Sequence, residues 1–500
     1  MGLDWAKYVC PILLPISFLY DSILYWLTLA RYYTRHLHGT HEERVLKVQE
    51  QVRRWQVEGR GRKMCTARPS WMSISQQKLG YKDTMYRVKI DLGDVLEIDK
   101  EKMIVRVEPA VTIGFLNRLL VANGYTLPVV PELDILTIGG LVMGGGLEST
   151  SHKYGLFQYI CSEFEIVAAD GEVMIANHDT NSDLYYALPV SYGTLGFLTS
   201  VSIRIIPYKP YMKLTYRPAY SIDETISLLD RETHKATSND SVEGIVYNVN
   251  QSVIMTGQYV EEEEVEKDKI NRMGLWFKPW FYKYVEKFLE KGETIEYVPT
   301  LHFHQRHNKG TFWLTPMWLP WAHNIIARFL FGWILPVNPQ LLNWLKETFV
   351  GGEFEDNFNL QDFIIPMKHV KEGILLSAEI TDVWPLWMVP TRLYQPQGPK
   401  SLMPRGGDTM YVDLGVYGLS HLKTFKGRDA TLRLFEKFAL EHDGFQALYA
   451  ETLMTNEEFE TMYTGDLYYS VRKRIPNCEK AFPRLFDKIS REGRQGKKIL

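Results

Sequence analysis

The residues best suited to chemistry lie between Thr137 and Gly155, in a run that reads TIGGLVMGGGLESTSHKYG. Its glycines leave backbone amides open to a ligand because no Cβ atom intervenes, and successive amides in a turn form a cradle for phosphate. Hydroxyl side chains follow at Ser149, Thr150 and Ser151. The run predicts a site for the diphosphate of a nucleotide cofactor, with a tight turn or a linker as the structural alternative.

One alternative for this run is a Rossmann-type dinucleotide site. GGGLES, from Gly144, is a near miss to the dinucleotide fingerprint, with Ser149 in the third glycine place. That fingerprint needs a helix directly after the loop. Residues 149–160 are poor helix formers, since they include two Ser, a Thr, a His and Gly155. The sequence therefore disfavours a Rossmann unit.

The flanking segments predict the elements that hold this run in place. Upstream, the pattern predicts a strand over 104–107 and a helix over 113–122 that ends at Asn123-Gly124. Downstream, FEIVAADGEVMIA predicts a β-hairpin that turns at Asp170-Gly171, and VSIRIIP predicts a further strand. Between the anchor described below and these elements, HEERVLKVQEQVRRWQVEG predicts an amphipathic helix.

This order of parts resembles the FAD-binding domain of the vanillyl-alcohol-oxidase (PCMH) superfamily. Within it, TLPVVPELDILTIGGLVMGGGLESTSHKYGLFQYIC is similar to the Δ24-sterol reductases, the 24-dehydrocholesterol reductase or diminuto type. Further similar segments are KMCTARPSW, EKMIVRVEP, GLWFKPWFYKYVE, LFGWILP and GFQALYAETLM. The resemblance thus covers nearly all of the chain after the first 40 residues.

The resemblance implies an α+β fold in four parts. These are an N-terminal membrane anchor helix with its flank (1–40), a two-part PCMH-type FAD-binding domain (41–207), an α+β cap or substrate domain (208–430), and a C-terminal helical segment that returns to the flavin (431–500). Strand-like segments such as VEGIVYNVN and SVIMTGQYV belong to the expected cap domain.

The implied activity is an NADPH-dependent reduction of the 24,25 side-chain double bond of sterols. FAD is expected to be non-covalent, because the histidine that carries a covalent flavin in some relatives is missing. No separate fingerprint for NADPH is present. Two other functions stay open: a flavin oxidase of the same fold, and a non-catalytic sterol-binding or scaffold protein.

The resemblance places the FAD on the glycine run and on the CTARPSW segment. Arg68 in that segment is expected to give the diphosphate a bidentate charge, with a surface salt bridge as the alternative. The other expected FAD-binding residues are Thr137, Ile138, Gly139, Gly140, Leu141, Val142, Met143, Gly144, Gly145, Gly146, Leu147, Glu148 and Ser149.

The implied reaction needs a strong acid, because an isolated alkene has no carbonyl to absorb negative charge. Protonation of one alkene carbon and hydride delivery to the other require a proton donor shielded from water. Tyr449 is the first candidate and Glu451 the second, with Arg306 and His307 as polar support. The alternative for Tyr449 is a buried tyrosine bonded to backbone.

The histidines of LHFHQRH do not predict a metal site, because no carboxylate or cysteine cluster stands near them in the sequence. Aromatic residues make up 13% of the chain, and many tryptophans fall between Trp276 and Trp344. They fit either a well-filled core or a surface that meets lipid headgroups. We expect sterol contacts from Trp313, Phe329, Trp384 and Trp387.

Composition narrows the class of protein. A chain of 500 residues with 45% hydrophobic residues can bury a full core. Its net charge of −3 disfavours nucleic acid as a partner. The 4 cysteines include no C-x-x-C pair, so neither a disulfide framework nor a zinc site is expected.

The N-terminal segment 8–30 is apolar and long enough to cross a bilayer. Asp21 and two prolines within it keep an interfacial anchor open as the alternative. Since Lys7 alone precedes the segment whereas Arg31 and Arg35 follow closely, the catalytic body is expected to face the cytoplasm. The endoplasmic reticulum membrane is the location that the resemblance implies.

A second apolar segment, 313–336, is not expected to span a membrane. Prolines interrupt it, and His323 and Arg328 would be costly in hydrocarbon. An interface-facing lid is the expectation for this segment.

Overall fold

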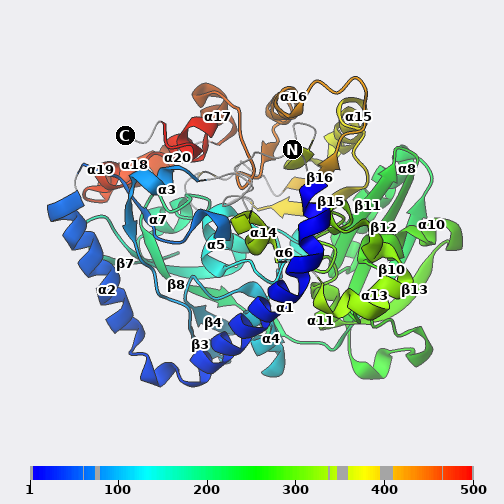
Figure 1. Cartoon of the computed structure of the whole chain (residues 1–500), viewed down its shortest axis with the longest axis horizontal. Helices are drawn as coiled ribbons and strands as arrows, with labels where there is room; N and C mark the ends of the chain where they lie inside the picture. The colour runs from blue at the N-terminus through cyan, green and yellow to red at the C-terminus, as the bar shows by residue number, and fades with distance from the viewer. Residues whose placement is uncertain are drawn as a thin grey trace.

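The computed structural model describes residues 4–59, 61–73, 79–335, 338–345, 358–394, 402, 409–463 and 465–497. Within these ranges a five-stranded and an eight-stranded sheet, both antiparallel, lie side by side with helices around them (Figure 1). The mixed α+β class is confirmed. Parts of the predicted anchor, cap domain and C-terminal segment fall outside the described residues, among them 1–3, 336–337, 346–357 and 498–500. The four domain boundaries stay predictions.

The smaller sheet contains the hairpin that the sequence predicted. Its strand order is β3-β4-β8-β6-β7. The strands are β3 (Val95–Asp99), β4 (Ile104–Val107), β8 (Phe197–Arg204), β6 (Cys161–Val167) and β7 (Val173–Asn177). β6 and β7 pair in antiparallel register through a turn in which Gly171 has φ +84°. The predictions of a strand over 104–107 and of the 170–171 turn are confirmed.

Helices beside the smaller sheet begin at the caps that their sequences provide. The side chain of Thr112 accepts a hydrogen bond from the Phe115 amide and starts α4 (Ile113–Ala122), which confirms the predicted range. Thr40 and Glu43 form a capping box at the start of α2 (His41–Arg54), which buries its valines and continues as one π-helical turn, Trp55–Gly59. Short neighbours are α3 (Tyr81–Thr84), α7 (Ser182–Ala187), and the strand pairs β1 (Met64–Thr66) with β2 (Tyr86–Val88) and β5 (Tyr125–Thr126) with β9 (Ile206–Pro207).

The larger sheet has the order β13-β10-β12-β11-β15-β16-β14-β17. Its strands are β13 (Thr294–Pro299), β10 (Tyr211–Ala219), β12 (Gln251–Val260), β11 (Ser241–Asn248), β15 (Leu386–Leu393), β16 (Thr409–Leu419), β14 (Phe358–Pro366) and β17 (Phe445–Gln446). Three helices pack on its outer face, α8 (Ile222–Glu232), α15 (Val370–Ile380) and α16 (Arg428–Glu441).

Alternation along β14 decides which side chains face inward. Phe363 stacks on Phe435 of α16 with ring centroids 4.6 Å apart, so odd-numbered positions face the helices. Because successive side chains on a strand point to opposite faces, Leu360, Asp362 and Ile364 face the smaller-sheet half of the molecule.

The remaining helices cover the two halves. The C-terminal group packs on the smaller sheet, where the Tyr468 and Thr194 hydroxyls lie 2.7 Å apart and Phe482 contacts Phe197. It consists of α17 (Asn456–Met462), α18 (Asp466–Arg474), α19 (Cys478–Ala481), α20 (Leu485–Ile489) and α21 (Arg491–Arg494). The tryptophan-rich part forms α9 (Phe281–Glu286), α10 (Phe288–Lys291), α11 (Thr300–His304), α12 (Thr315–Trp318), α13 (Ile325–Phe331) and α14 (Pro339–Leu345).

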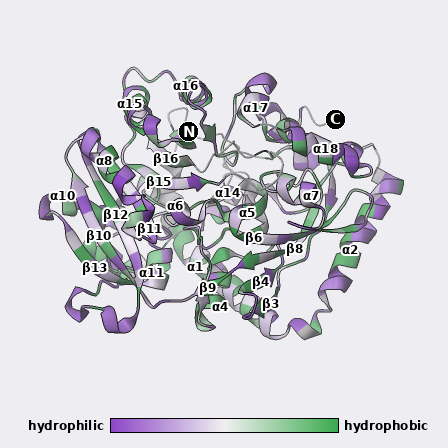
Figure 2. Ribbon diagram, turned by 180° about the vertical axis from the view of Figure 1, so that it is seen from behind, coloured by the Kyte–Doolittle hydropathy of each residue, from purple (hydrophilic) through white to green (hydrophobic). Residues whose placement is uncertain are grey.

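The N-terminal helix α1 (Asp4–Tyr33) crosses the front of the molecule in Figure 1. Among the described residues, its part Ile12–Tyr33 is the one helix long and apolar enough to cross a membrane. Figure 2 shows hydrophobic residues along α1, α4 and neighbouring strands. The second apolar segment is broken into α12, α13 and short 3-10 turns, as its prolines predicted, with Pro336 outside the described residues.

Candidate active site

A cavity of about 1570 Å³ lies between the two sheets and extends to α1. Its walls come from the glycine run, from the inward face of β14, β15 and β16, and from α1 and α14. A pocket for one drug-sized ligand measures roughly 300–1,000 Å³. The volume therefore suits two ligands that meet inside one cavity.

The glycine run is not the open loop that the sequence predicted. The Thr137 hydroxyl accepts a hydrogen bond from the Gly140 amide at 3.3 Å and caps a short helix, α5 (Ile138–Gly144). The cap offsets the poor helix propensity of glycine. After it, α6 (Ser151–Tyr154) is a single turn, in agreement with the weak helix signal there.

Helix formation divides the predicted FAD-binding residues into two groups. Ile138 and Val142 point into the core and are fully buried. Glu148 and Ser149 also lie outside the cavity lining. The residues of the run that line the cavity are Thr137, Gly139, Gly140, Leu141, Met143, Gly144, Gly145, Gly146 and Leu147.

Glycine is required at two of these positions for different reasons. A Cβ atom on Gly139 would stand 2.7 Å from the Cβ of Pro109, so a side chain there would force the helix away from the preceding segment. Gly145 has φ +89°, which other residues rarely adopt. Together they keep the backbone of α5 and its end exposed to the cavity.

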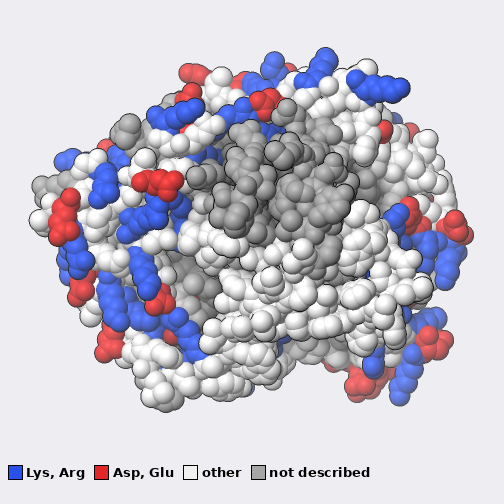
Figure 3. Space-filling view, in the orientation of Figure 1, with Lys and Arg blue, Asp and Glu red and all other residues white. Residues whose placement is uncertain are grey.

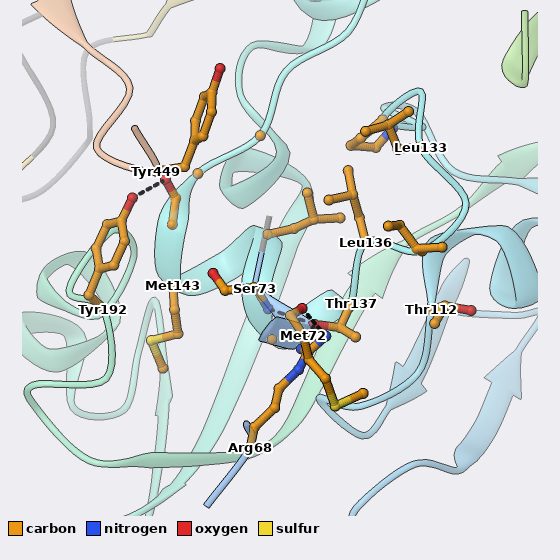
Figure 4. A pocket seen from close by; sticks show the side chains of 18 of the residues that line it. Arg68, Met72, Ser73, Thr112, Leu133, Leu136, Thr137, Met143, Tyr192 and Tyr449 are labelled. Carbon is orange, nitrogen blue, oxygen red and sulfur yellow. Dashed lines mark hydrogen bonds between the residues drawn. The ribbon is translucent and has the colours of Figure 1, made fainter. Parts of the chain in front are cut away.

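Arg68 points at the start of this helix. Its Nη1 donates to the Thr137 hydroxyl at 3.0 Å and its Nη2 to the Met72 carbonyl at 3.0 Å (Figure 4). Its Nε is buried and has no hydrogen-bond partner, and no carboxylate among the described residues pairs with this side chain. Burial lowers the pKa of Arg68, the sign of a cation that lacks a counter-charge.

These features fit the diphosphate of a nucleotide cofactor. The Arg68 side chain, the positive end of α5 and the bare glycine backbone all line this cavity. Lys82 and Lys488 line the cavity as well, and burial lowers the pKa of Lys488 to about 8. We call these residues the cationic end.

The same cavity is also lined by a carboxylate held by two phenols. Tyr449 donates from its hydroxyl to Oδ2 of Asp362 at 2.6 Å, and Tyr417 donates to Oδ1. Asp362 pairs across the sheet with Gly415, where a Cβ would stand 2.6 Å from the Tyr417 hydroxyl. The missing side chain thus gives Tyr417 the room to reach Asp362. Burial raises the pKa of Asp362 to about 6.

Two further carboxyl groups face the same space. Asp413 on β16 pairs with Ile364, so it lies diagonally from Asp362 on the same face of the sheet. Its Oδ1 is buried without a hydrogen-bond partner. Burial, and then the charges of Asp362 and Glu132, raise its pKa well above the usual range. Burial raises the pKa of Glu132 to about 8. We call Glu132, Asp362, Asp413, Tyr417 and Tyr449 the acid cluster.

The cavity therefore holds both the residues that could bind a diphosphate and the residues that could supply a proton. A profile of the FAD binding domain matches residues 45–177. The chain is 41% identical to Delta(24)-sterol reductase of Homo sapiens over 489 residues, 97% of this chain and 93% of that protein. It is 36% identical to Delta(24)-sterol reductase of Arabidopsis thaliana over 462 residues, 87% of this chain and 82% of that protein.

A nematode relative agrees. The chain is 35% identical to a Delta(24)-sterol reductase homolog of Caenorhabditis elegans over 500 residues, 98% of this chain and 95% of that protein. The chain belongs to the Δ24-sterol reductase family. The FAD-binding domain that the resemblance implied is confirmed, and it includes both Arg68 and the whole glycine run.

In this Δ24-sterol reductase family member, Arg306 and His307 do not contact the cavity, contrary to expectation. Arg306 is fully buried and donates to Glu148 at 2.5 Å and to Glu243 at 2.6 Å. His307 and Trp387 contact the other oxygen of Glu243, at 3.1 and 3.0 Å. The pair thus joins the end of the glycine run to β11, and supports Trp387, which does line the cavity.

Removal of the Arg306 charge is expected to lower the free energy of unfolding. Arg306→Met removes the cationic partner that Glu148 and Glu243 share, and breaking such a buried pair costs about 3–5 kcal/mol. The decrease is measured by urea denaturation. Arg53→Met is the control, because Arg53 forms a surface pair with Glu172 at 3.3 Å, a class worth about 0–1 kcal/mol. Equal urea midpoints for the two variants would contradict a stabilising role of the Arg306 ion pairs.

The two candidate proton donors lie in different environments. Tyr449 lines the cavity, whereas Glu451 does not. Glu451 is buried in an ion-pair group with Arg428, 3.3 Å away, and Arg491. Because Glu451 does not line the cavity and is held by these two arginines, it is dropped as a donor.

The expected aromatic contacts to a sterol are mostly placed elsewhere. Of the four candidates, only Trp387 lines the cavity. Trp313 is buried and donates to the Tyr417 carbonyl at 2.7 Å, Trp384 donates to Asp382, and Phe329 is exposed on α13. Within the described ranges, no three or more His, Cys, Asp or Glu side chains are placed to hold a metal ion.

Sequence reasoning missed Asp362, Asp413, Glu132 and Tyr417. A signal was present, because NLQDFIIP and MYVDLGVYG each carry one aspartate directly beside apolar residues of a strand. A lone carboxylate in a strand of this kind must be buried, and a buried carboxylate marks a functional site.

Proposed function

We propose that this protein is an FAD-dependent reductase that saturates the 24,25 side-chain double bond of sterols with NADPH as the reductant. The observation that carries the proposal is one cavity lined both by the cationic, glycine-bearing residues and by the buried acid cluster. The large volume accommodates the flavin and a sterol side chain together.

Residues of the cationic end hold the cofactor. The Arg68 guanidinium and the backbone of Gly139, Gly140 and Gly144 to Gly146 would bind the diphosphate. Lys82 and Lys488, which line the same cavity, add positive charge. Bound FAD, once reduced, supplies the hydride that the alkene receives.

Asp413 replaces Tyr449 as our proposed proton donor. Tyr449 has one proton, which it donates to Asp362, and burial raises its pKa well above 10. A phenol with so high a pKa is too weak an acid for an alkene. Asp413 is instead held as a neutral carboxylic acid in a shielded site, a state suited to donating a proton. Its O–H bond breaks as a C–H bond forms at one alkene carbon.

Asp362 then has a different task from Asp413. Protonation of the alkene leaves positive charge on the neighbouring tertiary carbon. The Asp362 carboxylate lies on the same face of the sheet as Asp413. The two tyrosine hydroxyls fix its orientation, so that it stabilises the developing charge without rearrangement. Tyr449 and Tyr417 are thus positioning residues for Asp362.

We further propose that the protein is bound to the endoplasmic reticulum membrane with its catalytic body in the cytoplasm. The apolar α1 and a membrane-dissolved substrate support membrane association. Arg31 in the last turn of α1 and Arg35 just after it support the orientation.

Product analysis tests the function. The full-length protein with FAD, NADPH and a Δ24 sterol should yield a sterol two mass units heavier. Hydrogen peroxide without NADPH consumption would favour a flavin oxidase instead. A protein that binds sterol but gives no flavin spectrum after FAD addition would favour a non-catalytic role.

The rate of sterol reduction is expected to rise with pH through about 6. Asp362 has a raised pKa of about 6, so its stabilising carboxylate is present above that pH and is lost below it. Between pH 5 and 7 the ionised fraction rises about tenfold. The check is the rate at which a sterol oxidises the pre-reduced flavin across this range.

Asp362→Asn should remove this pH dependence and leave the rate low at every pH. Asp223→Asn, on the exposed surface of α8, should keep it. If the rate of the Asp362 variant still rises with pH through about 6, another group causes the titration.

A further inference from the structure

Helix α1 is held against the body along most of its length. Near its middle, Ser17 accepts from the Asn338 amide at 2.7 Å and Asp21 from the Asn338 side chain at 2.5 Å. Near its end, Arg31 donates to Asp94 at 2.7 Å. Ser17 and Arg31 are about 21 Å apart along the helix. A helix that crossed a bilayer could not keep both attachments to a body on one side.

Helix α1 turns several polar residues toward the body and a long apolar stripe away from it. Its polar residues Ser17, Asp21 and Arg31 face the body. An apolar stripe at helical spacing faces outward, with Ile12 70% and Trp26 65% exposed. The stripe consists of Ile12, Ile16, Leu19, Ile23, Trp26 and Leu27.

A second exposed apolar group continues this stripe. It lies on α13 and the turn after it and consists of Ile325, Ile326, Phe329, Leu330, Phe331 and Trp333, with Ile325 69% exposed. Phe18 of α1 contacts Trp333 edge-on, with ring centroids 5.2 Å apart. The two groups therefore form one surface, which we call the apolar face.

The apolar face carries almost no charge. In Figure 3 the surface over α1 and α13 is white, and lysines and arginines appear to its side, over α2. An uncharged patch of aliphatic and aromatic residues that includes Trp26 and Trp333 matches the interface of a bilayer.

We infer that the apolar face docks into one leaflet of a lipid bilayer, with α1 lying in the membrane plane rather than across it. This inference does not depend on the proposed reaction. The inner side of the same helix lines the cavity through Asp21, Leu24, Tyr25 and Thr28. One helix, about 10 Å thick, thus separates docked lipid from the cavity.

Glycan mapping tests the position of α1. The full chain is expressed in microsomes with a glycan acceptor added at the N-terminus or at the C-terminus. An in-plane helix leaves both ends on one side, so both acceptors are modified or neither is. Modification of the N-terminal acceptor alone would show a spanning helix and overturn the inference.

Vesicle binding tests α13 separately. Phe329→Glu with Leu330→Glu should lower binding of the purified, FAD-loaded protein to phosphatidylcholine vesicles by at least about tenfold, since two apolar side chains that would enter the leaflet become charged. The control is Leu375→Glu on α15, 41% exposed and outside the apolar face. Unchanged vesicle binding would overturn docking through α13. Docking through α13 would also be overturned if the detergent-solubilised protein were a dimer and the double variant a monomer, because a second copy would then cover the apolar face.

Discussion

Asp413→Asn is expected to slow oxidation of the reduced flavin by a Δ24 sterol by about 10²- to 10⁴-fold, the usual contribution of a general acid. Asparagine keeps the size of the side chain but has no acidic proton to give to the alkene. The buried site tolerates the change, because a neutral amide replaces a group whose pKa burial already raises. The measurement is the rate of flavin re-oxidation in a single turnover.

Two control measurements distinguish loss of the proton donor from damage to the fold. The Asp413 variant should retain FAD and should still be reduced by NADPH at the normal rate, because neither step uses the acid cluster. Asp179→Asn, on the exposed surface beside β7, should behave like the unchanged protein. A normal re-oxidation rate in the Asp413 variant would move the proton donor to another residue.

Arg68→Met is expected to weaken FAD binding by roughly 30- to 3,000-fold. Loss of one partner of a buried charge pair costs about 2–5 kcal/mol, and each 1.4 kcal/mol is tenfold in affinity. Methionine fills a similar volume but cannot donate to a diphosphate. The FAD dissociation constant is measured by fluorescence titration of the flavin-free protein.

Arg62→Met provides the matched control. Arg62 is exposed and precedes the same segment, where it lies over the ring of Tyr86. That variant should bind FAD normally. Arg68→Lys should fall between the two, because lysine keeps the charge but loses the bidentate geometry. Equal FAD affinity in the two methionine variants would refute the role of Arg68.

Local signals in the sequence were sufficient for much of the smaller-sheet half. The 113–122 helix has a threonine cap and a closing Asn-Gly pair, and the 170–171 turn requires a glycine, so each is determined by its neighbours in the chain. The same local reasoning did not predict the helix in the glycine run. Helix α5 depends on the Thr137 cap and on packing against distant residues, which propensity alone does not include.

The acid cluster could not be assembled from local patterns for a similar reason. Asp362 and Asp413 are brought together by the pairing of β14 with β16, two strands separated by a helix and a further strand. Arg306 and His307 were misplaced because their partners, Glu148 and Glu243, come from two other parts of the chain. Residue type indicated chemistry at these positions, but only tertiary contacts show which group touches the cavity.

Helix α1 faces lipid on one side and lines the cavity on the other. This position changes how the turnover of the enzyme should be described. The substrate then reaches the cavity by lateral diffusion within a two-dimensional solvent, and the relevant concentration is the mole fraction of sterol in that leaflet. Adding inert phospholipid at a constant amount of sterol would slow the reaction through surface dilution, although the bulk concentration is unchanged. Michaelis constants for such an enzyme belong on a mole-fraction scale.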